Sequence, residues 1–149
     1  MELRFVSEKT INGLSVRTDN ATEMYPNKGK IGALWQTFDR AVPVDYKNGE
    51  RVYGVYSDYE SDHTGAFTVL AGFDGTSFPS DSNVKPITIP AANYLVFKYQ
   101  GEIPQIAIDA WTEVWNYFSQ GKVEYQRLYS TDFEFYPSGN EIEVHIAVK

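Results

Sequence analysis

Apolar side chains in the first half of the chain change from strand-like to helical spacing and back again. Residues 2–19 have the spacing of an extended chain, with a turn predicted at Asn12-Gly13. After Pro26-Asn27, apolar residues recur at positions i, i+3, i+4 and i+7, which predicts a helix that ends before Pro43. The apolar face of this helix consists of Ile31, Leu34, Trp35 and Phe38.

Two strands are predicted after a polar loop at residues 43–50. They cover Val52–Asp58 and Ala66–Phe73, and the hairpin loop Glu60–Gly65 joins them. The first half is therefore expected to run strand, helix, strand, strand.

The second half repeats this order. An extended segment runs from Ile87 to Phe97, and Pro104 suits the first turn of a second helix. A strand at Phe133–Tyr136, a turn at Ser138-Gly139 and an alternating strand at residues 142–148 follow. The apolar face of the second helix consists of Ala107, Ala110, Trp111, Val114, Trp115 and Phe118.

Aromatic positions are repeated together with the element order. The stretch Tyr53-Gly-Val-Tyr56 aligns with Phe133-Glu-Phe-Tyr136, and the pair Trp35/Phe38 aligns with Trp115/Phe118 at the same offset. We interpret residues 1–74 and 84–149 as a duplicated module inside one domain, 1–149.

The expected fold is α+β. Each strand-helix-strand-strand module would form one small antiparallel sheet backed by one helix, and the two sheets would lie side by side. A central ligand cleft is expected between the halves, because junctions between modules are favoured binding places.

Composition narrows the classes of partner. The hydrophobic content of 42% and charged content of 22% are typical of globular proteins. A formal net charge of −7 disfavours direct nucleic-acid binding and anionic membranes, and it favours cationic partners. Three Trp, eleven Tyr and nine Phe form an aromatic load that suits a binding pocket.

Sequence motifs for cofactors and metals are missing. The chain has no Cys, no Gly-rich phosphate loop and no Gly-x-Ser-x-Gly elbow, so we expect no cofactor. The acidic loop with Asp58, Glu60, Asp62 and His63 lacks the spacing of a metal site, so no metal is expected. Since no targeting or membrane-spanning segment is evident, the expected location is the cytoplasm.

One carboxylate is set between aromatic residues near the end of the chain. Alternation along a strand places Glu134 and Tyr136 on one face, with Phe133 and Phe135 on the other. In the first half, Gly54 and Tyr56 take the positions of Glu134 and Tyr136. If both faces turn to the cleft, Gly54 leaves room, the tyrosines supply rings and Glu134 supplies the charge for a flat cation.

Pairing of the last two strands leaves a simpler alternative open. The turn at Ser138-Gly139 predicts that Tyr136 opposes Glu141 and that Glu134 opposes Glu143. The face would then be the solvent side of an antiparallel sheet, with His145 also exposed.

The tryptophans have two interpretations as well. Trp35, Trp111 and Trp115 lie on apolar helical faces, which favours core packing. Trp111 is the better cleft candidate, because the repeat aligns it with Ile31 and packing therefore does not require a ring there. The candidate ligand-binding residues are Glu134, Tyr136, Tyr56, Trp111, Tyr53 and Trp115, and none is predicted to be catalytic.

Several segments of the second half together resemble a known family. They are the helix Ile108–Trp115, the strands Asp132–Pro137 and Ile142–Val148, and the preceding Ile89–Gly101. Their order and spacing resemble the gyrase-inhibitor-like, AraC-type effector-binding domain family. The resemblance implies a duplicated strand-helix-strand-strand fold and a cleft for lipophilic, often cationic, small molecules. It also implies that Glu134 matches the buried Glu with which the multidrug-sensing members neutralise a drug.

Relatives in that family differ in context and activity. Many carry the domain behind a DNA-binding helix-turn-helix, which this sequence lacks, so it looks closer to stand-alone members such as those encoded in integron cassettes. Other stand-alone relatives antagonise gyrase toxins, and some hydrolyse strained, DNA-alkylating natural products.

Three functions follow as hypotheses. The leading one is a cytoplasmic, non-enzymatic protein that binds hydrophobic cations. The second is a hydrolase or detoxifying enzyme in which Glu134 activates water against an electrophile and Tyr136 donates a hydrogen bond. The third is an acidic interaction module that docks a partner protein or forms a homodimer.

Overall fold

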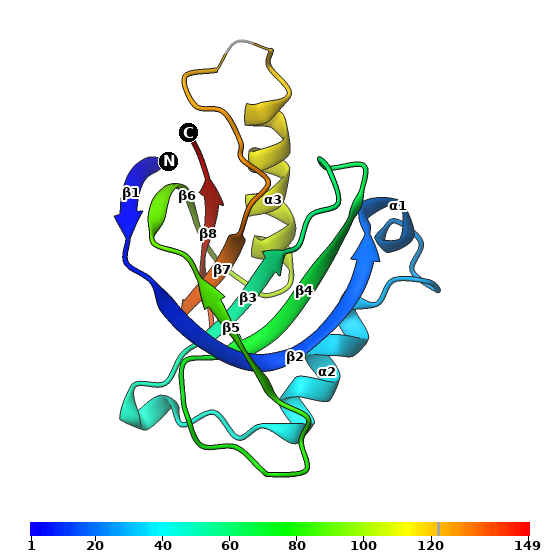
Figure 1. Cartoon of the computed structure of the whole chain (residues 1–149), viewed down its shortest axis with the longest axis vertical. Helices are drawn as coiled ribbons and strands as arrows, with labels where there is room; N and C mark the ends of the chain where they lie inside the picture. The colour runs from blue at the N-terminus through cyan, green and yellow to red at the C-terminus, as the bar shows by residue number, and fades with distance from the viewer. Residues whose placement is uncertain (122) are drawn as a thin grey trace.

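Eight strands form one curled antiparallel sheet in the computed structural model of the chain (Figure 1). The structure describes residues 1–149 except Lys122. The strands lie in the order β1-β6-β8-β7-β3-β4-β2-β5. Their bounds are β1 Glu2–Val6, β2 Lys9–Asp19, β3 Val52–Ser57, β4 Ala66–Phe73, β5 Lys85–Ile89, β6 Ala92–Gln100, β7 Asp132–Ser138 and β8 Glu141–Ala147.

The α+β class is confirmed, but the prediction of two sheets is wrong. The two halves join because β3 and β7, the inner strands of the sets β5-β2-β4-β3 and β1-β6-β8-β7, pair with one another in antiparallel register. Their contact runs from Val52 opposite Tyr136 to Tyr56 opposite Asp132, with Gly54 opposite Glu134 at its centre. Backbone hydrogen bonds thus fuse two expected sheets into one.

The sheet has an internal symmetry: if each strand is replaced by its equivalent in the other half, the strand order is unchanged when it is read from the opposite edge. Strands β2, β4 and β3 of the first half correspond to β6, β8 and β7 of the second. The outermost strands are exchanged, since β1 pairs with β6 and β5 pairs with β2. A duplicated module would give this arrangement, with its symmetry axis between Gly54 and Glu134.

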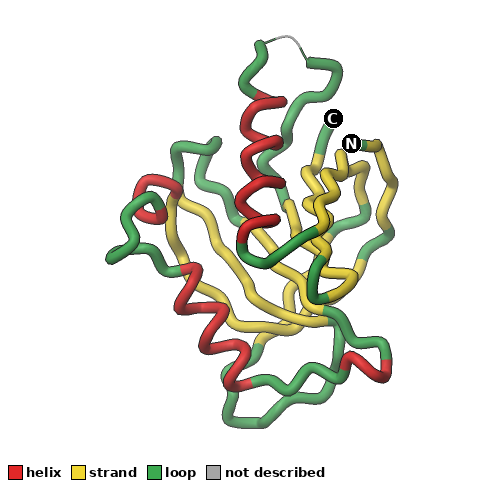
Figure 2. Tube along the Cα trace, turned by 180° about the vertical axis from the view of Figure 1, so that it is seen from behind, coloured by secondary structure: helices red, strands yellow, loops and turns green. Residues whose placement is uncertain are grey.

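Two long helices lie on the same side of the sheet (Figure 2). They are α2, Ile31–Ala41, and α3, Gln105–Phe118, and both agree with the predicted helices. Two short elements were not predicted: the helix α1, Asn20–Glu23, and the 3-10 turn η1, Tyr46–Asn48.

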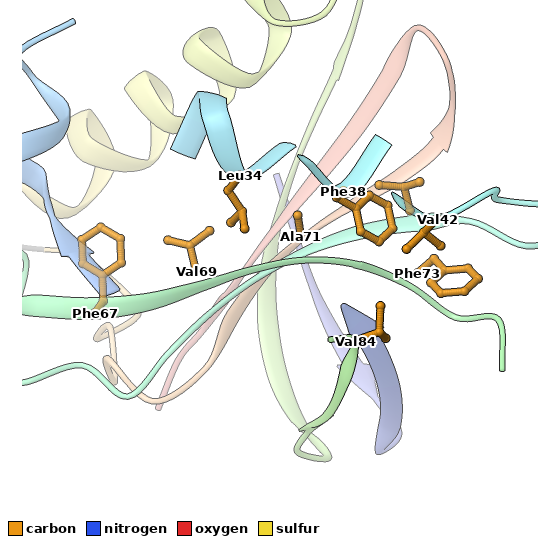
Figure 3. Close-up of a cluster of buried hydrophobic side chains, with 9 residues drawn as sticks. Leu34, Phe38, Val42, Phe67, Val69, Ala71, Phe73 and Val84 are labelled. Carbon is orange, nitrogen blue, oxygen red and sulfur yellow. The ribbon is translucent and has the colours of Figure 1, made fainter. Parts of the chain in front are cut away.

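Each long helix has its own hydrophobic core. Figure 3 shows Leu34 and Phe38 of α2 with Val69, Ala71 and Phe73 of β4. The α3 core joins Ile106, Ala110 and Val114 to the strands β6 and β8. The two helices therefore pack on separate parts of the sheet.

The reverse face of the sheet is also buried. A third cluster there contains Ile11, Tyr53, Val55, Leu70, Ile89, Tyr94, Phe133 and Ala147. Side chains from β2, β4, β5, β6 and β8 join those of β3 and β7 in this cluster, so the residues of β3 and β7 are buried on both sides of the sheet.

The predicted turn at Asn12-Gly13 is wrong, because both residues lie inside the continuous strand β2. The chain instead breaks at Ser7-Glu8, between β1 and β2. A side chain at Gly13 would overlap the carbonyl oxygen of Ala71 on β4, so this glycine permits close strand contact.

The predicted register of the last hairpin is also wrong. Glu134 lies opposite Val144, and Phe135 lies opposite Glu143. The register shifts between Phe135 and Ser138, a stretch that contains Pro137, which has no N–H for the ladder. Glu134 and Glu143 therefore point to opposite faces of the sheet and do not repel one another across the strands.

The start of α2 is held by a residue from α1. The Glu23 carboxylate accepts hydrogen bonds from the backbone N–H groups of Lys30 (2.8 Å) and Ile31 (3.1 Å). A carboxylate at this position satisfies free N–H groups and complements the helix dipole. In the described part of the chain, no helix is long and apolar enough to cross a membrane.

Candidate ligand-binding site

A cavity of about 950 Å³ lies between α2 and α3. Strands β3 and β7 contribute Val52, Tyr56, Glu134 and Tyr136 to its wall. The helices contribute the remaining large surfaces, with Ile31, Trp35 and Asp39 from α2 and Ala107, Ile108, Trp111 and Trp115 from α3. Its volume falls near the upper end of the range for small-molecule sites.

Glu134 is buried in the wall of this cavity, with 3% of its surface exposed. Its Oε2 accepts hydrogen bonds from Trp111 Nε1 (2.7 Å) and the Tyr56 hydroxyl (3.1 Å). Its Oε1 accepts one from the Tyr136 hydroxyl (3.0 Å). All three donors are neutral, and among the described residues no Lys or Arg forms an ion pair with Glu134.

Burial dominates the electrostatics of this carboxyl group. Desolvation raises the pKa of Glu134 above its ordinary value, although the three hydrogen bonds act in the opposite direction. Burial and the nearby negative charge raise the pKa of Tyr56 and of Tyr136 well above that of a free tyrosine. Both hydroxyls therefore stay protonated as donors, and among the described residues no cation pairs directly with Glu134.

Gly54 provides the space that the carboxylate occupies. The two residues are directly opposite in the β3–β7 pair. A Cβ atom at Gly54 would overlap Glu134 Oε1 and would lie 3.1 Å from Trp35 Cζ2. Glu134 can therefore take this position only because residue 54 has no side chain.

Aromatic rings surround the carboxylate. The Trp111 and Tyr56 ring centroids are 5.0 Å apart, and Trp35 meets Tyr136 edge-on at 5.9 Å. Trp115 stands further out, 43% exposed, with its ring 5.4 Å from that of His63. Ring faces next to a buried negative charge suit a cation with apolar substituents.

Five of the six candidate residues come together in the cavity: Glu134, Tyr136, Tyr56, Trp111 and Trp115. Tyr53 does not, because strand alternation turns it to the reverse face. There it packs on Phe135, with ring centroids 5.1 Å apart, and the Lys9 ammonium lies 5.4 Å from its ring. Trp35, which its helical position assigned to the core, lines the cavity as well.

The solvent-face alternative is wrong for Glu134 and for His145, which are both buried. The His145 ring stacks on Phe133 at 4.1 Å on the reverse face. Burial lowers the pKa of His145 to about 4, so the ring is neutral near pH 7. Glu143 has a partner on that face, the Arg4 guanidinium at 2.9 Å.

A second polar cluster at the cavity was not predicted. The fully buried Asp132 carboxylate accepts hydrogen bonds from Tyr59 (2.6 Å), from Arg127 (3.1 Å) and from the backbone N–H of Ala147 (2.8 Å). Arg127 and Tyr59 both line the cavity. Arg127 lies in an irregular segment with no periodic pattern, so nothing in the sequence indicated that it would meet Asp132.

No metal site accompanies these clusters in the part of the chain that the structure describes. No group of three or more His, Cys, Asp or Glu side chains there is arranged to hold a metal ion. In the acidic hairpin loop, Asp62 accepts hydrogen bonds from the Thr64 backbone and hydroxyl (2.9 and 2.6 Å).

Comparison with known proteins identifies relatives along the whole chain. A sequence model of the Cass2 family, described as integron-associated effector binding protein, matches residues 2–148. An integron cassette protein from the mobile metagenome of Vibrio cholerae is 39% identical, and its crystal structure superposes with a TM-score of 0.89. This match covers 99% of the present chain and 95% of the other.

More distant structures share the fold. A bacterial transcription regulation protein from Staphylococcus aureus MU50 is 19% identical, with a TM-score of 0.71 over 99% of this chain and 97% of that one. The structure of SAV2435 bound to tetraphenylphosphonium is also 19% identical, with a TM-score of 0.69 and coverage of 99% and 93%. Among proteins with curated functions, none matches significantly.

Proposed function

Because the chain belongs to the Cass2 family of integron-associated effector binding proteins, we propose that it binds lipophilic organic cations in the cavity between α2 and α3. The observation that carries this proposal is the buried Glu134 carboxylate, which meets three neutral donors and no cation among the described residues. A ligand that brings one positive charge would supply the missing compensation.

The arrangement of donors favours a particular kind of cation. An ionised carboxylate has about four lone-pair sites. Three of them already accept from Trp111, Tyr56 and Tyr136, so little hydrogen-bonding capacity is left for a primary ammonium group. A quaternary or delocalised cation needs no lone pair and gains instead from the field of the carboxylate and from the surrounding rings.

A relative's ligand supports the same class. Tetraphenylphosphonium, which is bound in the structure of SAV2435, is a lipophilic cation with no N–H donor. Its charge is surrounded by phenyl groups, which would pack on rings such as Trp35 and Trp111 in the present cavity. That protein shares the fold at 19% identity, so its ligand serves here as the first probe to test.

The experiment is a tryptophan-fluorescence titration with tetraphenylphosphonium and with neutral triphenylmethane, which carries phenyl groups but neither a charge nor an oxygen acceptor. The phosphonium should bind more tightly, and Glu134→Gln should lose about 2–5 kcal/mol of its binding free energy, as expected when one member of a buried charge pair is removed. The matched control is Glu8→Gln, which makes the same change of net charge at an exposed position in the β1–β2 turn. Equal affinity of the wild type and Glu134→Gln for the phosphonium would refute the role of the charge.

The same samples separate binding from turnover. Strained electrophiles are added to these samples as probes. If the protein only binds its ligands, the probes are recovered unchanged after incubation, as chromatography can establish. A product that forms with the wild type and is absent with Glu134→Gln would support the enzymatic alternative instead.

A further inference from the structure

The cavity has a second polar side chain besides Glu134. Arg127 lines the cavity, and only 9% of its side chain is exposed. Three rings surround its guanidinium carbon, with centroids 4.4 Å away for Tyr129, 5.9 Å for Tyr59 and 6.0 Å for Trp111. A positive charge held this deeply has few contacts with water, so its hydrogen bonds must come from the protein or from a ligand.

The hydrogen-bonding capacity of Arg127 is not used up. Its Nη2 donates to Asp132 Oδ2 at 3.1 Å, while its buried Nε has no acceptor among the described residues. A guanidinium group carries five N–H donors. The aromatic faces around it are poor substitutes for an oxygen acceptor, so an acceptor delivered by a ligand would gain a charge-assisted hydrogen bond.

The charge of Arg127 is already balanced by the fully buried Asp132. The pair as a whole adds no net charge to the cavity, so it does not oppose a cation at Glu134. A ligand carboxylate would approach Asp132 closely and be repelled, whereas a neutral carbonyl oxygen would not. The site therefore suits an amide, ester or ketone oxygen better than an anion.

Trp111 connects the two polar groups. Its ring nitrogen donates to Glu134 Oε2 at 2.7 Å, and its ring centroid lies 6.0 Å from the Arg127 guanidinium carbon. The carboxylate and the guanidinium therefore both lie next to the same indole ring. A single drug-sized ligand can reach both groups from the cavity that they share.

We propose that Arg127 forms an acceptor subsite, and that the preferred ligands are lipophilic cations that also carry a neutral carbonyl oxygen. The cationic centre lies at Glu134 and the carbonyl accepts from Arg127, with the apolar remainder packed along Trp111. This inference rests on the proposed cation-binding function and narrows its ligand class.

The test uses two rosamine dyes with the same delocalised cation. The pendant phenyl ring of one carries an ethyl ester, and that of the other carries a butyl group of similar size and no acceptor. The wild type should bind the ester at least about tenfold more tightly, because a hydrogen bond to a charged group exceeds the cost of desolvating the ester. Equal binding, or tighter binding of the butyl dye, would overturn the proposal.

A double variant assigns the preference to Arg127. Arg127→Met with Asp132→Asn removes the donors and the charge pair together, so no buried charge is left alone. The ester preference should disappear, so that the variant binds the two dyes with about equal affinity. A preference that persists in the folded variant would mean that another residue recognises the ester, which contradicts the assignment.

Two outcomes distinguish this inference from the function on which it rests. If neither dye binds, or if Glu134→Gln binds the butyl dye as tightly as the wild type does, the cation-binding proposal fails. If both dyes bind through Glu134 with equal affinity, cation binding stands and the Arg127 subsite is refuted. Should the double variant fail to fold, the ratio of the two dyes on the wild type still decides the proposal.

Discussion

Titratable groups on the two faces of the sheet beside β7 have different partners. On the reverse face, His145 is neutral and stacked on Phe133, and Glu143 is paired with Arg4. On the cavity face, Glu134 is as buried as His145, but among the described residues it accepts hydrogen bonds from neutral donors only. Burial alone does not make a binding site; the difference is that one face satisfies its charges internally and the other leaves a charge for a ligand to compensate.

Gly54 explains how the cavity face tolerates that charge. The Glu134 side chain occupies the space above Gly54, at the centre of the β3–β7 pair. If two copies of one module form the sheet, equivalent side chains meet at this point, and two carboxylates there would compete for one space. One half therefore supplies the charge and the other half supplies the room.

The largest effect is expected when a second charge is added to the cavity face. Gly54→Glu would place two buried carboxylates against each other, with no room for both, and should cost more than about 4 kcal/mol of unfolding free energy. Gly54→Ala introduces the steric clash without the charge and should cost about 1–3 kcal/mol of unfolding free energy. Denaturant unfolding measures both values.

Gly32→Ala is the matched control for these variants, since a side chain there meets nothing within 4 Å. It should be neutral or slightly stabilising in the helix α2. A Gly54→Ala protein as stable as this control would contradict the close packing of Glu134 on Gly54.

The reverse face should determine the acid sensitivity of the fold. Because the pKa of His145 falls from 6.5 to about 4 on folding, the unfolded chain binds a proton that the folded chain does not. The free energy of unfolding therefore carries no penalty from His145 above pH 6.5. It falls by about 3 kcal/mol as the pH is lowered from 6.5 to 4.

The measurement is the free energy of unfolding at pH 7 and pH 4. Between pH 7 and pH 4, His145→Gln should lose about 3 kcal/mol less unfolding free energy than the wild type loses. His63→Gln removes the chain's other histidine, which is exposed, and should behave as the wild type does. Identical pH profiles for the wild type and His145→Gln would show that His145 is not buried as a neutral ring.

A smaller effect on the cavity face is expected from loss of one donor. Tyr136→Phe removes the hydrogen bond to Glu134 Oε1, which stabilises the charged form by about 2 kcal/mol. The pKa of Glu134 should rise further, and the pH at which phosphonium binding is half-maximal should rise by about one unit or more. The exposed Tyr25→Phe is the control, and an unchanged midpoint in Tyr136→Phe would argue against the network.

Local patterns predicted much of the fold and five side chains that line the cavity. Helical spacing identified α2 and α3, and alternation placed Glu134 and Tyr136 on one face with Phe133 and Phe135 on the other. The family shown by the sequence match also agrees with the resemblance that these segments suggested.

The errors concern one long-range strand pairing and several local details. Pairing of β3 with β7 is a long-range contact that no local pattern specifies, so the single sheet was missed. The irregularity around Pro137 changed the partner of Glu134 by one residue. Tyr53 was grouped with Tyr56 by the repeat, although three residues along a strand reverse the face. Arg127 was missed because its partner Asp132 is defined only by the folded chain.

The most direct test of the central claim is to measure the pKa of Glu134 itself. The pKa is obtained from the pH dependence of the ¹³C chemical shift of its carboxyl carbon, with and without saturating tetraphenylphosphonium. Without ligand, the pKa should lie above the ordinary value because of burial. With the cation bound, the pKa should fall, since a positive charge favours the ionised form. The affinity should then fall about tenfold for each pH unit below the free-state pKa, until the pH reaches the lower bound-state pKa. A pKa that is the same in both states would mean that the cation does not interact with Glu134.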